Sequence, residues 1–352
     1  MNAYDQLERP SASRSLATVL AIALSSISAV FGSAAVAQTQ DECAAVDLTV
    51  QPAEPVVIRY GLTGGGEEPL ALLWADRASY PNNGRFYDLQ PTLYQPTDRM
   101  AAFQAGQLEA GTISLPGLAA AAFRGINARA VATLVQVNEA DNEGAFVTLS
   151  GSGITSAADL VGKRVGYYGP NTISEFWVRH AMRMAGADSN NVSFLALPPP
   201  AQEQALRNGQ IDVAWMARQF LAQARAAGGV DVVMTPYQAA QSTQPSLMIF
   251  FSPEFVEAHP QAYCAWRADF QQALQTWGEN REPLFPLLIA ASYIRPSSAT
   301  AGPDGGRSPG GAMSLADIDR TLQQMTEVGF LRPNMVRPAS ELVLPGYALI
   351  AD

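Results

Sequence analysis

Hydrophobic and polar positions recur with two different periods in the segment from Asp159 to Ala217. Residues 165–168 form a short apolar run, and the turn residues Gly169, Pro170 and Asn171 follow it. After the turn, apolar side chains recur at the spacing of a helix with one buried face; they are Ile173, Phe176, Trp177, His180, Ala181 and Met184. The pattern predicts a strand followed by an amphipathic helix.

The predicted helix begins at Thr172, because Thr172 and Glu175 have the spacing of a capping box. Two further strands, at residues 192–197 and 211–215, enclose a helix at residues 201–208. Strands that alternate with helices of this length are typical of a parallel sheet. We therefore predict two consecutive βαβ units in this part of the chain.

The preceding part of the chain has the same order of strands and helices. We expect one first sheet with helices at residues 67–76, 98–106 and 117–124 and strands at 56–62, 89–94, 110–114, 128–136 and 145–149. An apolar strand at residues 247–251 carries the chain back, and helices follow at 253–259, 261–277, 283–293 and 314–328. Residues 296–311, rich in Gly, Pro and Ser, are expected to form a mobile surface loop.

Three phrases in this pattern resemble a known family. They are DLVGKRVG at residues 159–166, LRNGQIDVA at 206–214 and, in the first half, FQAGQLEAG at 103–111. Together with the glycine-containing turn that opens a helix, they resemble periplasmic solute-binding proteins of the nitrate/taurine/alkanesulfonate and thiamine-pyrimidine group, the NMT1/THI5-like and SsuA-like family. The resemblance covers about residues 56–256.

The resemblance implies an α/β fold of the type II periplasmic-binding kind. Two lobes, each with a mainly parallel sheet flanked by helices, would enclose a ligand cleft. The domain boundaries we expect are a signal peptide at 1–37, an N-terminal arm at 38–55, lobe 1 at 56–150 and 246–352, and lobe 2 at 151–245.

The N-terminus has the pattern of a secretory signal peptide. Arg9 and Arg14 precede an apolar run at residues 16–31, and Ala35-Val36-Ala37 has the small residues of a cleavage site. The apolar run is shorter than the roughly 20 residues that a membrane span needs. We therefore expect export to the periplasm.

Charge and cysteine content narrow the classes further. The chain has 352 residues and a net charge of −10, from 22 basic and 32 acidic residues, which disfavours nucleic acid as a partner. Cys43 and Cys264 are the only cysteines, and an even pair in an exported chain indicates a disulfide, with two buried thiols as the alternative. The two histidines, His180 and His259, offer few metal ligands, so we expect neither a metal nor a cofactor.

The candidate ligand site follows from the sheet order, because ligands of open parallel sheets bind beyond the carboxyl ends of strands. This rule nominates the loops at residues 63–68, 114–117, 168–174 and 215–218, with Asn142 and Ser246 from the hinge strands. The candidate ligand-binding residues are Gly64, Gly65, Glu67, Ser114, Leu115, Phe146, Tyr168, Asn171, Thr172, Ser174, Trp215, Met216 and Tyr237.

Each candidate has an ordinary structural explanation beside the functional one. The glycines either present backbone amides to a ligand or form a flexible turn. Thr172 and Ser174 either donate to an anion or cap a helix. Trp215, at the end of a strand, either stacks on a ligand or belongs to the core.

The charge of the ligand is left open by the sequence. Glu67, Glu68 and Glu175 lie at predicted helix starts, which suits the helix dipole. An acid facing the cleft would favour an amine or a heteroaromatic N–H over a sulfonate or nitrate. Arg99, Arg124 and Arg218 are the possible counter-charges for an anion.

The leading hypothesis is a monomeric solute-binding subunit of an ABC importer, which binds a small organic, aromatic or nitrogen-containing molecule and delivers it to a membrane permease. The alternatives are nitrate- or sulfonate-type anions as ligands, a role in feeding an extracytoplasmic sensor, and an enzyme similar to thiamine-pyrimidine synthases. The clustered cysteines of those synthases are missing, and no H-E-x-x-H or P-loop motif occurs. We therefore expect no catalytic residues.

The cleavage site leads to a first prediction. The mature protein begins near Gln38, because Ala35-Val36-Ala37 fits the small-residue requirement of signal peptidase. N-terminal sequencing of material from the periplasmic fraction tests this, and a sequence that still starts at Met1 contradicts it.

Overall fold

The computed structural model describes residues 41–140, 144–296, 299, 304 and 306–351. The chain divides into two units, Met1–Gln38 and Thr39–Asp352, and every element described below belongs to the second unit. The signal peptide expected at residues 1–37 and the hinge residue Asn142 lie outside the described residues.

Five strands form the first sheet in the order β2 (Tyr87–Leu93), β1 (Val56–Leu62), β3 (Ala110–Ile113), β10 (Gln244–Phe251) and β4 (Arg129–Val137). β1 pairs in parallel with β2 and β3, whereas β10 is antiparallel to both β3 and β4. The returning strand that the sequence predicts is therefore β10, and it lies inside the sheet between two strands from the first half of the chain.

The second sheet repeats this plan in the order β7 (Ser193–Ala196), β6 (Arg164–Tyr167), β8 (Val213–Ala217), β5 (Gly144–Leu149) and β9 (Val230–Met234). β6 is parallel to β7 and β8, and β5 is antiparallel to β8 and β9. Each sheet thus has one reversed strand among four that run the same way. The predicted α/β fold class with two mainly parallel sheets is confirmed.

The strand expected at residues 145–149 exists as β5, but its assignment to the first sheet is wrong. Phe146 of β5 pairs with Trp215 of β8 and with Met234 of β9, both in the second sheet. The chain therefore leaves the first sheet between β4 and β5, which places the change of lobe before residue 150. Hydrophobic patterning identifies a strand, but its partners are chosen by packing between distant segments.

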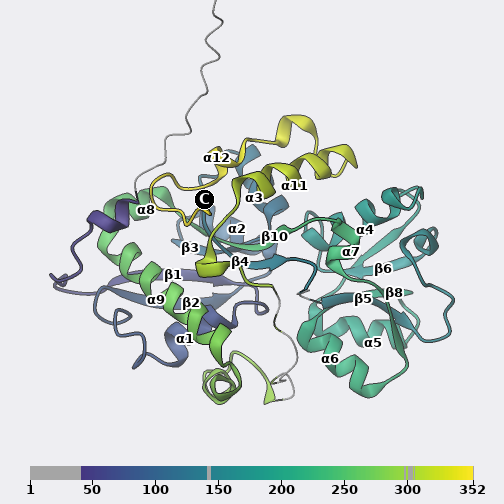
Figure 1. Cartoon of the computed structure of the whole chain (residues 1–352), viewed down its shortest axis with the longest axis horizontal. Helices are drawn as coiled ribbons and strands as arrows, with labels where there is room; N and C mark the ends of the chain where they lie inside the picture. Colours follow the sequence, from purple (N-terminus) through teal and green to yellow (C-terminus); the bar gives the residue numbers. More distant parts are fainter. Residues whose placement is uncertain (1–40, 141–143, 297–298, 300–303, 305, 352) are drawn as a thin grey trace, which may run out of the picture. The chain divides into compact units, whose positions relative to one another are not determined.

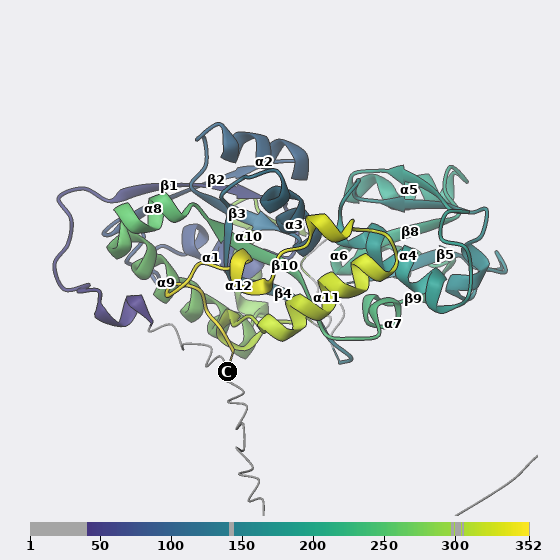
Figure 2. The ribbon, with the colours of Figure 1, turned by 90° about the horizontal axis from the view of Figure 1, so that it is seen from above.

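Helices cover both faces of each sheet (Figures 1 and 2). One face of the first sheet packs against α1 (Glu68–Ala75), α9 (Pro260–Glu279) and α10 (Phe285–Ala290), and α8 (Pro253–Ala258) precedes α9. One face of the second sheet packs against α5 (Gln202–Arg207) and α6 (Arg218–Ala227). None of the helices in the described residues is long and apolar enough to cross a membrane.

The remaining two faces share one continuous hydrophobic core. It is built by α2 (Pro96–Gln104), α3 (Leu115–Phe123), α11 (Leu315–Glu327) and α12 (Ala339–Leu342) beside the first sheet and by α4 (Ile173–Met184) and α7 (Pro236–Ala240) beside the second. The two lobes are therefore joined by packing as well as by the chain connections.

α11 makes this join. It packs against β10, α3 and α4, and Phe330, just beyond its end, contacts Phe176 of α4 with ring centroids 5.9 Å apart. Gln324 of α11 accepts a hydrogen bond from the amide of Gln244 at 2.8 Å. Gln244 in turn accepts one from the indole of Trp177 at 3.1 Å, so α11, β10 and α4 are linked by polar contacts too.

The segment 296–311 is not a simple surface loop. Gly306 and Ser308 are buried, and the carbonyl of Gly306 accepts a hydrogen bond from the backbone of Gln136 at 2.8 Å. This part of the segment packs against β4, contrary to the surface position expected from its composition. Residues 297–298, 300–303 and 305 lie outside the described part of the chain.

The N-terminal arm is attached to the first lobe by a disulfide. Cys43, in a short helical turn (Glu42–Ala45), is bonded to Cys264 of α9, with Cα atoms 5.4 Å apart. Arg267 of α9 adds an ion pair to Asp41 at 2.8 Å. The disulfide that we expected from the even number of cysteines is therefore present in the structure.

The disulfide leads to a second prediction. Because the bridge closes a loop between residues 221 positions apart, Cys264→Ser is expected to lower the free energy of unfolding by about 2–4 kcal/mol. Exported protein that is denatured without reductant and then alkylated should gain no alkyl groups by intact mass. Two adducts on that material would show that the cysteines are unpaired.

Candidate functional site

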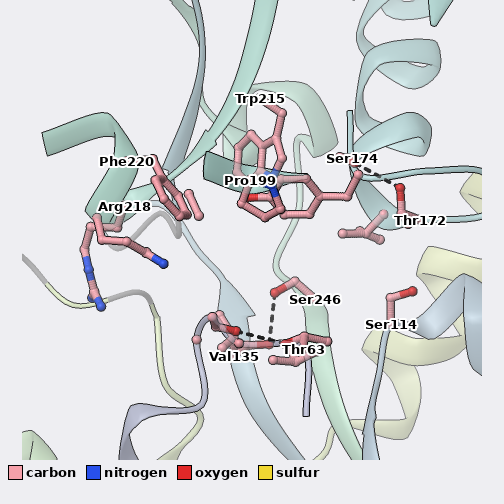
Figure 3. A pocket seen from close by; sticks show the side chains of 18 of the residues that line it. Thr63, Ser114, Val135, Thr172, Ser174, Pro199, Trp215, Arg218, Phe220 and Ser246 are labelled. Carbon is pink, nitrogen blue, oxygen red and sulfur yellow. Dashed lines mark hydrogen bonds between the residues drawn. The ribbon is translucent and has the colours of Figure 1, made fainter. Parts of the chain in front are cut away.

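A pocket of about 180 Å³ lies where loops of both lobes meet. The four loops nominated by the sequence contribute to it: Thr63 follows β1, Ser114 follows β3, Tyr168 follows β6, and Arg218 follows β8. The remaining lining comes mainly from β4, β10, the loop before α5, and α6. Figure 3 shows the second lobe's Trp215, Pro199 and Ser174 on one side and the first lobe's Thr63, Ser114 and Ser246 on the other.

The structure brings together about half of the predicted site residues. Those in the pocket lining are Gly64, Gly65, Ser114, Tyr168, Thr172, Ser174 and Trp215. Ser246, nominated from the hinge strand, also lines the pocket. Loops at the carboxyl ends of parallel strands from both sheets therefore meet at one pocket.

The other predicted site residues lie outside the pocket lining. Leu115, Phe146 and Met216 are buried in the cores, and Tyr237 packs against the shared core from α7. Met216 follows Trp215 in β8, so its side chain points to the opposite face of the sheet. Asn171 lies on another surface, where its backbone N–H donates to Glu175 at 3.3 Å. The alternation of a strand places only every second side chain on a given face.

Glu67 is buried behind the glycine loop rather than exposed in the pocket. Its carboxylate accepts hydrogen bonds from the backbone N–H groups of Thr63 at 2.9 Å and Gly64 at 2.8 Å, and from the hydroxyl of Thr112. Burial raises the pKa of this carboxyl group. The N–H of Gly64, one of the amides that could have faced a ligand, therefore holds the protein's own carboxylate.

The glycine loop requires glycine for a backbone reason. Gly64 has a φ of +82°, and a Cβ at this position would come within 2.8 Å of Leu93. Its conformation is one that other residues rarely adopt. The loop is thus a tight turn fastened by Glu67, which favours the structural explanation of the glycines over the functional one.

Thr172 does not form the predicted capping box with Glu175. Its hydroxyl donates to the carbonyl of Gly169 at 2.7 Å and lies 3.0 Å from the hydroxyl of Ser174. No side-chain cap hydrogen bond forms at the start of α4. The two hydroxyl groups instead form a polar patch on the wall of the pocket.

Trp215 lines the pocket but is largely part of the core. Its exposed fraction is 2%, and its ring lies 5.0 Å from Phe146, 5.2 Å from Trp177 and 6.3 Å from Tyr168, measured between centroids. Only a small part of the ring is accessible from the pocket. Trp215 therefore belongs to the core with most of its ring and lines the pocket with the rest.

Several pocket residues were missed by the sequence argument. Tyr94 ends the run predicted as residues 89–94, so the strand-end rule had reason to include it. Phe220 lies one turn after the Trp215 loop, and Pro199 precedes α5. Arg307 comes from the Gly- and Pro-rich segment, where no periodic pattern marks it.

Arg307 is the centre of a partly buried ionic cluster. It donates to Asp304 at 3.0 Å, to Glu68 at 3.2 Å, and to the carbonyls of Gly66 and Leu134 at 2.6 and 3.0 Å. Trp277 of α9 donates its indole N–H to Asp304 at 2.7 Å. The cluster joins the C-terminal segment to the glycine loop, to β4 and to α9.

Arg218 extends this cluster to the second lobe. Its guanidinium pairs with Asp304 and lies 3.9 Å from Glu68. Burial alone would raise the pKa of Asp304, yet the positive charges of Arg307 and Arg218 hold this pKa well below its usual range. An ion pair thus crosses from one lobe to the other at the pocket.

The two other candidate counter-charges differ in position. Arg99 lines the pocket from α2. Its side chain lies directly against Gly61, where an added Cβ would be only 2.7 Å from Arg99 Cγ. Burial lowers the pKa of Arg99, and the nearby Glu67 charge opposes that effect. Arg124 is exposed at the end of α3 and donates to Ala120 at 3.2 Å, outside the pocket lining.

Two lobes, each with a mixed five-stranded sheet and joined around this pocket, define an α/β two-lobed fold of the type II periplasmic-binding kind. The chain belongs to the NMT1/THI5 like family, because the sequence pattern of that family matches residues 88–280. No curated protein sequence is significantly similar to the chain.

Solved structures with the same fold include two sulfonate-binding proteins and a nitrate-binding protein. The alkanesulfonate-binding protein SsuA from Xanthomonas axonopodis pv. citri, bound to MOPS, has a TM-score of 0.67 at 15% identity, covering 83% of this chain and 99% of that one. The periplasmic aliphatic sulphonate binding protein SsuA from Escherichia coli has a TM-score of 0.65 at 16% identity, covering 85% and 95%. The periplasmic nitrate-binding protein NrtA from Synechocystis PCC 6803 has a TM-score of 0.62 at 14% identity, covering 80% and 84%. At these identities the likeness shows the fold.

The ionic cluster leads to a third prediction. Asp304→Asn should lower the free energy of unfolding near neutral pH by about 3 kcal/mol, because it removes the negative charge between two guanidinium groups in a partly buried site. A carboxyl group with a depressed folded-state pKa stabilises the protein above its unfolded pKa and loses that contribution as the pH falls. The deficit of the variant should therefore shrink below about pH 4.

Urea unfolding at a series of pH values measures this difference. Asp231→Asn is the matched control, because Asp231 is exposed in β9, where its carboxylate accepts a hydrogen bond from the hydroxyl of Ser150 at 2.9 Å. The control should match the unmodified protein throughout. A deficit for Asp304→Asn that stays constant down to low pH contradicts the assigned role of the charge.

Proposed function

We propose that this protein is the solute-binding subunit of an ABC importer and binds one small organic molecule between its lobes. The observation that carries the proposal is the shared pocket, built by loops at the carboxyl ends of parallel strands from both sheets. A site divided between two lobes allows them to close on a solute. We further propose that the chain is exported to the periplasm, acts as a monomer and delivers its solute to a membrane permease.

The lining supports an organic ligand with a flat, partly apolar surface. Tyr94 comes from the first lobe, and Tyr168, Trp215 and Phe220 come from the second, so aromatic rings face the pocket from both sides. Aromatic contacts contribute roughly 1 kcal/mol beyond the burial of their area. The hydroxyl groups of Ser114, Ser174 and Ser246 add neutral polar contacts that fix the orientation of a bound molecule.

A second candidate ligand class is a nitrate- or sulfonate-type anion. It is supported by what the structurally similar proteins are described as binding, namely sulfonates, MOPS and nitrate. The same architecture serves either class, because the identity of a ligand depends on a few side chains within one fold.

The enzyme alternative receives little support from the residues present. His180 is buried in α4, with Nδ1 2.7 Å from the carbonyl of Ala239, and His259 lies between α8 and α9. Both cysteines are in the disulfide. Neither histidine lines the pocket, so the usual partners of a nucleophile are away from the proposed site.

The proposal is tested by retention of a solute. Purified protein, unfolded and refolded to remove bound molecules, is dialysed against a small-molecule extract of its source cells, desalted and analysed by mass spectrometry. One molecule retained per chain is expected. Retention of no molecule contradicts a solute-binding role.

The fourth prediction concerns two aromatic residues of the pocket. Phe220→Ala should weaken binding of the retained molecule about fivefold or more with little change in melting temperature, because Phe220 is half-buried at the pocket. Trp215→Ala should lower the free energy of unfolding by about 3–5 kcal/mol, because it leaves a cavity among Phe146, Trp177 and Tyr168.

Calorimetric titration and thermal melts separate the two effects. Phe255→Ala, in α8 on the other side of the first lobe, is the control for loss of a half-buried ring away from the pocket. Unchanged affinity in both pocket variants would remove the aromatic contacts from the proposed site.

A further inference from the structure

Arg99 differs from the other two arginines that line the pocket. Arg218 and Arg307 are both paired with carboxylates. Within the described part of the chain, the guanidinium of Arg99 makes a single hydrogen bond, from Nη1 to the hydroxyl of Thr112 at 3.4 Å, and its buried Nε has no hydrogen-bond partner. Because a guanidinium has five N–H donors, most of the hydrogen-bonding capacity of this cation is not used by the described protein groups.

The stem of Arg99 is packed tightly against β1. A Cβ at Gly61 would lie 2.7 Å from Cγ and 2.8 Å from Cδ of Arg99, so a glycine is needed to leave room for this side chain. Arg99 is only 2% exposed, and a buried cation costs hydration energy unless hydrogen bonds or opposite charges offset it. The packed stem restricts where the guanidinium of this pocket residue can lie.

Glu67 acts on Arg99 through its charge and not through a direct hydrogen bond. The Glu67 carboxylate accepts hydrogen bonds from the backbone N–H groups of Thr63 and Gly64. It also accepts one from the hydroxyl of Thr112, and the same hydroxyl accepts the hydrogen bond from Arg99. Glu67 therefore offsets part of the positive charge from behind the glycine loop. An oxyanion of a solute can bind to Arg99 without displacing this carboxylate.

Ser114 places a second donor on the same side of β3 as Thr112. It follows Thr112 by two positions and is itself extended, so the two side chains leave the chain in the same direction. The Ser114 hydroxyl accepts a hydrogen bond from the backbone N–H of Gly117 at 3.4 Å at the start of α3, and a hydroxyl can donate its own hydrogen at the same time. The positive end of the α3 dipole also attracts a negative group. Arg99 and Ser114, both in the pocket lining, thus favour an oxyanion.

The second lobe's side of the pocket is aromatic. Tyr168, Trp215 and Phe220 line it, and Figure 3 shows Trp215 and Phe220 on the side of the second lobe and Ser114 on the side of the first. Rings of this kind pack favourably on a flat apolar group. The lining therefore has an aromatic part and a part with hydrogen-bond donors and a positive charge.

From these contacts we infer that the solute is an aromatic acid, with a carboxylate or sulfonate group bound by Arg99 and Ser114 and a ring packed on the aromatic residues of the second lobe. This inference rests on the proposed solute-binding function and narrows its ligand class. Hydrogen bonds between a guanidinium and an oxyanion are roughly twice as strong as those between neutral groups. Arg99 is thus the residue that sets the preference for an acid.

Four small molecules separate the acidic group from the ring in calorimetric titrations of the unmodified protein. Benzoate and benzenesulfonate carry both parts, benzamide has the ring without the charge, and acetate has the charge without the ring. At least one of the two aromatic acids is expected to bind at one site per chain, at least about tenfold more tightly than benzamide and acetate. The inference is overturned if neither aromatic acid binds saturably, or if benzamide or acetate binds as tightly as they do.

A change at Arg99 tests the assigned residue. Arg99→Met removes the charge and keeps an unbranched stem against Gly61, so it should weaken binding of the aromatic acid at least about tenfold and change benzamide binding by less than about twofold. Arg124→Met makes the same chemical change at an exposed position outside the pocket lining and should change neither. Arg99→Lys keeps the charge without the planar donor group and should lose less affinity than Arg99→Met.

Folding of each variant is checked by its thermal melt, and Arg99→Gln, with the same expected loss, replaces Arg99→Met if that variant does not fold. Undiminished binding of the aromatic acid by a folded variant without the charge overturns the role of Arg99. The comparison of benzoate and benzenesulfonate with benzamide on the unmodified protein does not depend on any variant.

The molecule retained from the cell extract distinguishes failure of this inference from failure of the proposed function. A retained molecule with both a ring and an acidic oxygen group supports the inference. A retained molecule that lacks either part overturns the inference and leaves the solute-binding function standing. Retention of no molecule contradicts the proposed function itself.

Discussion

The largely buried guanidinium of Arg307 makes the contacts on which the geometry of the pocket depends. Because a largely buried cation must keep its hydrogen bonds, its five donors fix the relative positions of three segments. These are the glycine loop with the start of α1, at Gly66 and Glu68, β4 at Leu134, and the C-terminal segment at Asp304. Through Asp304 the same network reaches α9 and Arg218 of the second lobe. The walls of the pocket are thereby positioned by electrostatics on one side of the molecule, while hydrophobic packing through α11 positions the lobes on another.

The sequence predicted those features of the fold that depend on local pattern. The amphipathic run at residues 173–184 is α4, the strand ends carry the pocket loops, and the two cysteines are bonded. The sequence failed where long-range contacts decide. β5 has the alternation of a strand, but its pairing with β8 and β9 depends on residues about seventy or more positions away, and β9 itself was not predicted. Phe146 was taken for a pocket residue and lies behind Trp215, because no local pattern shows which of two rings is nearer a cavity.

The polar part of the site shows the same division. Thr172 and Glu67 were assigned from the usual behaviour of helix starts, yet each has a partner that a spacing rule does not contain: the Gly169 carbonyl for Thr172, and the Thr112 hydroxyl for Glu67. Arg307 lies in a segment whose composition suggests exposure, and its burial results from acids supplied by α1 and by its own loop. Charge pairing of this kind depends on three-dimensional proximity, so it could be recognised only once the segments were placed.

The position of β10 inside the first sheet has a consequence for how this lobe is made. β3 and β4 are synthesised early, and only α3 separates them in the sequence. They nevertheless do not pair, because β10 lies between them in the sheet. Until the chain has been extended through Phe251, both strands have an unpaired edge, and α11, which covers β10, is synthesised later still. Contacts with such a long sequence separation are slow to form. The strands of the second lobe all lie between Gly144 and Met234, so they are all synthesised before β10 is complete. The lobe whose synthesis begins first is therefore the last to complete its sheet.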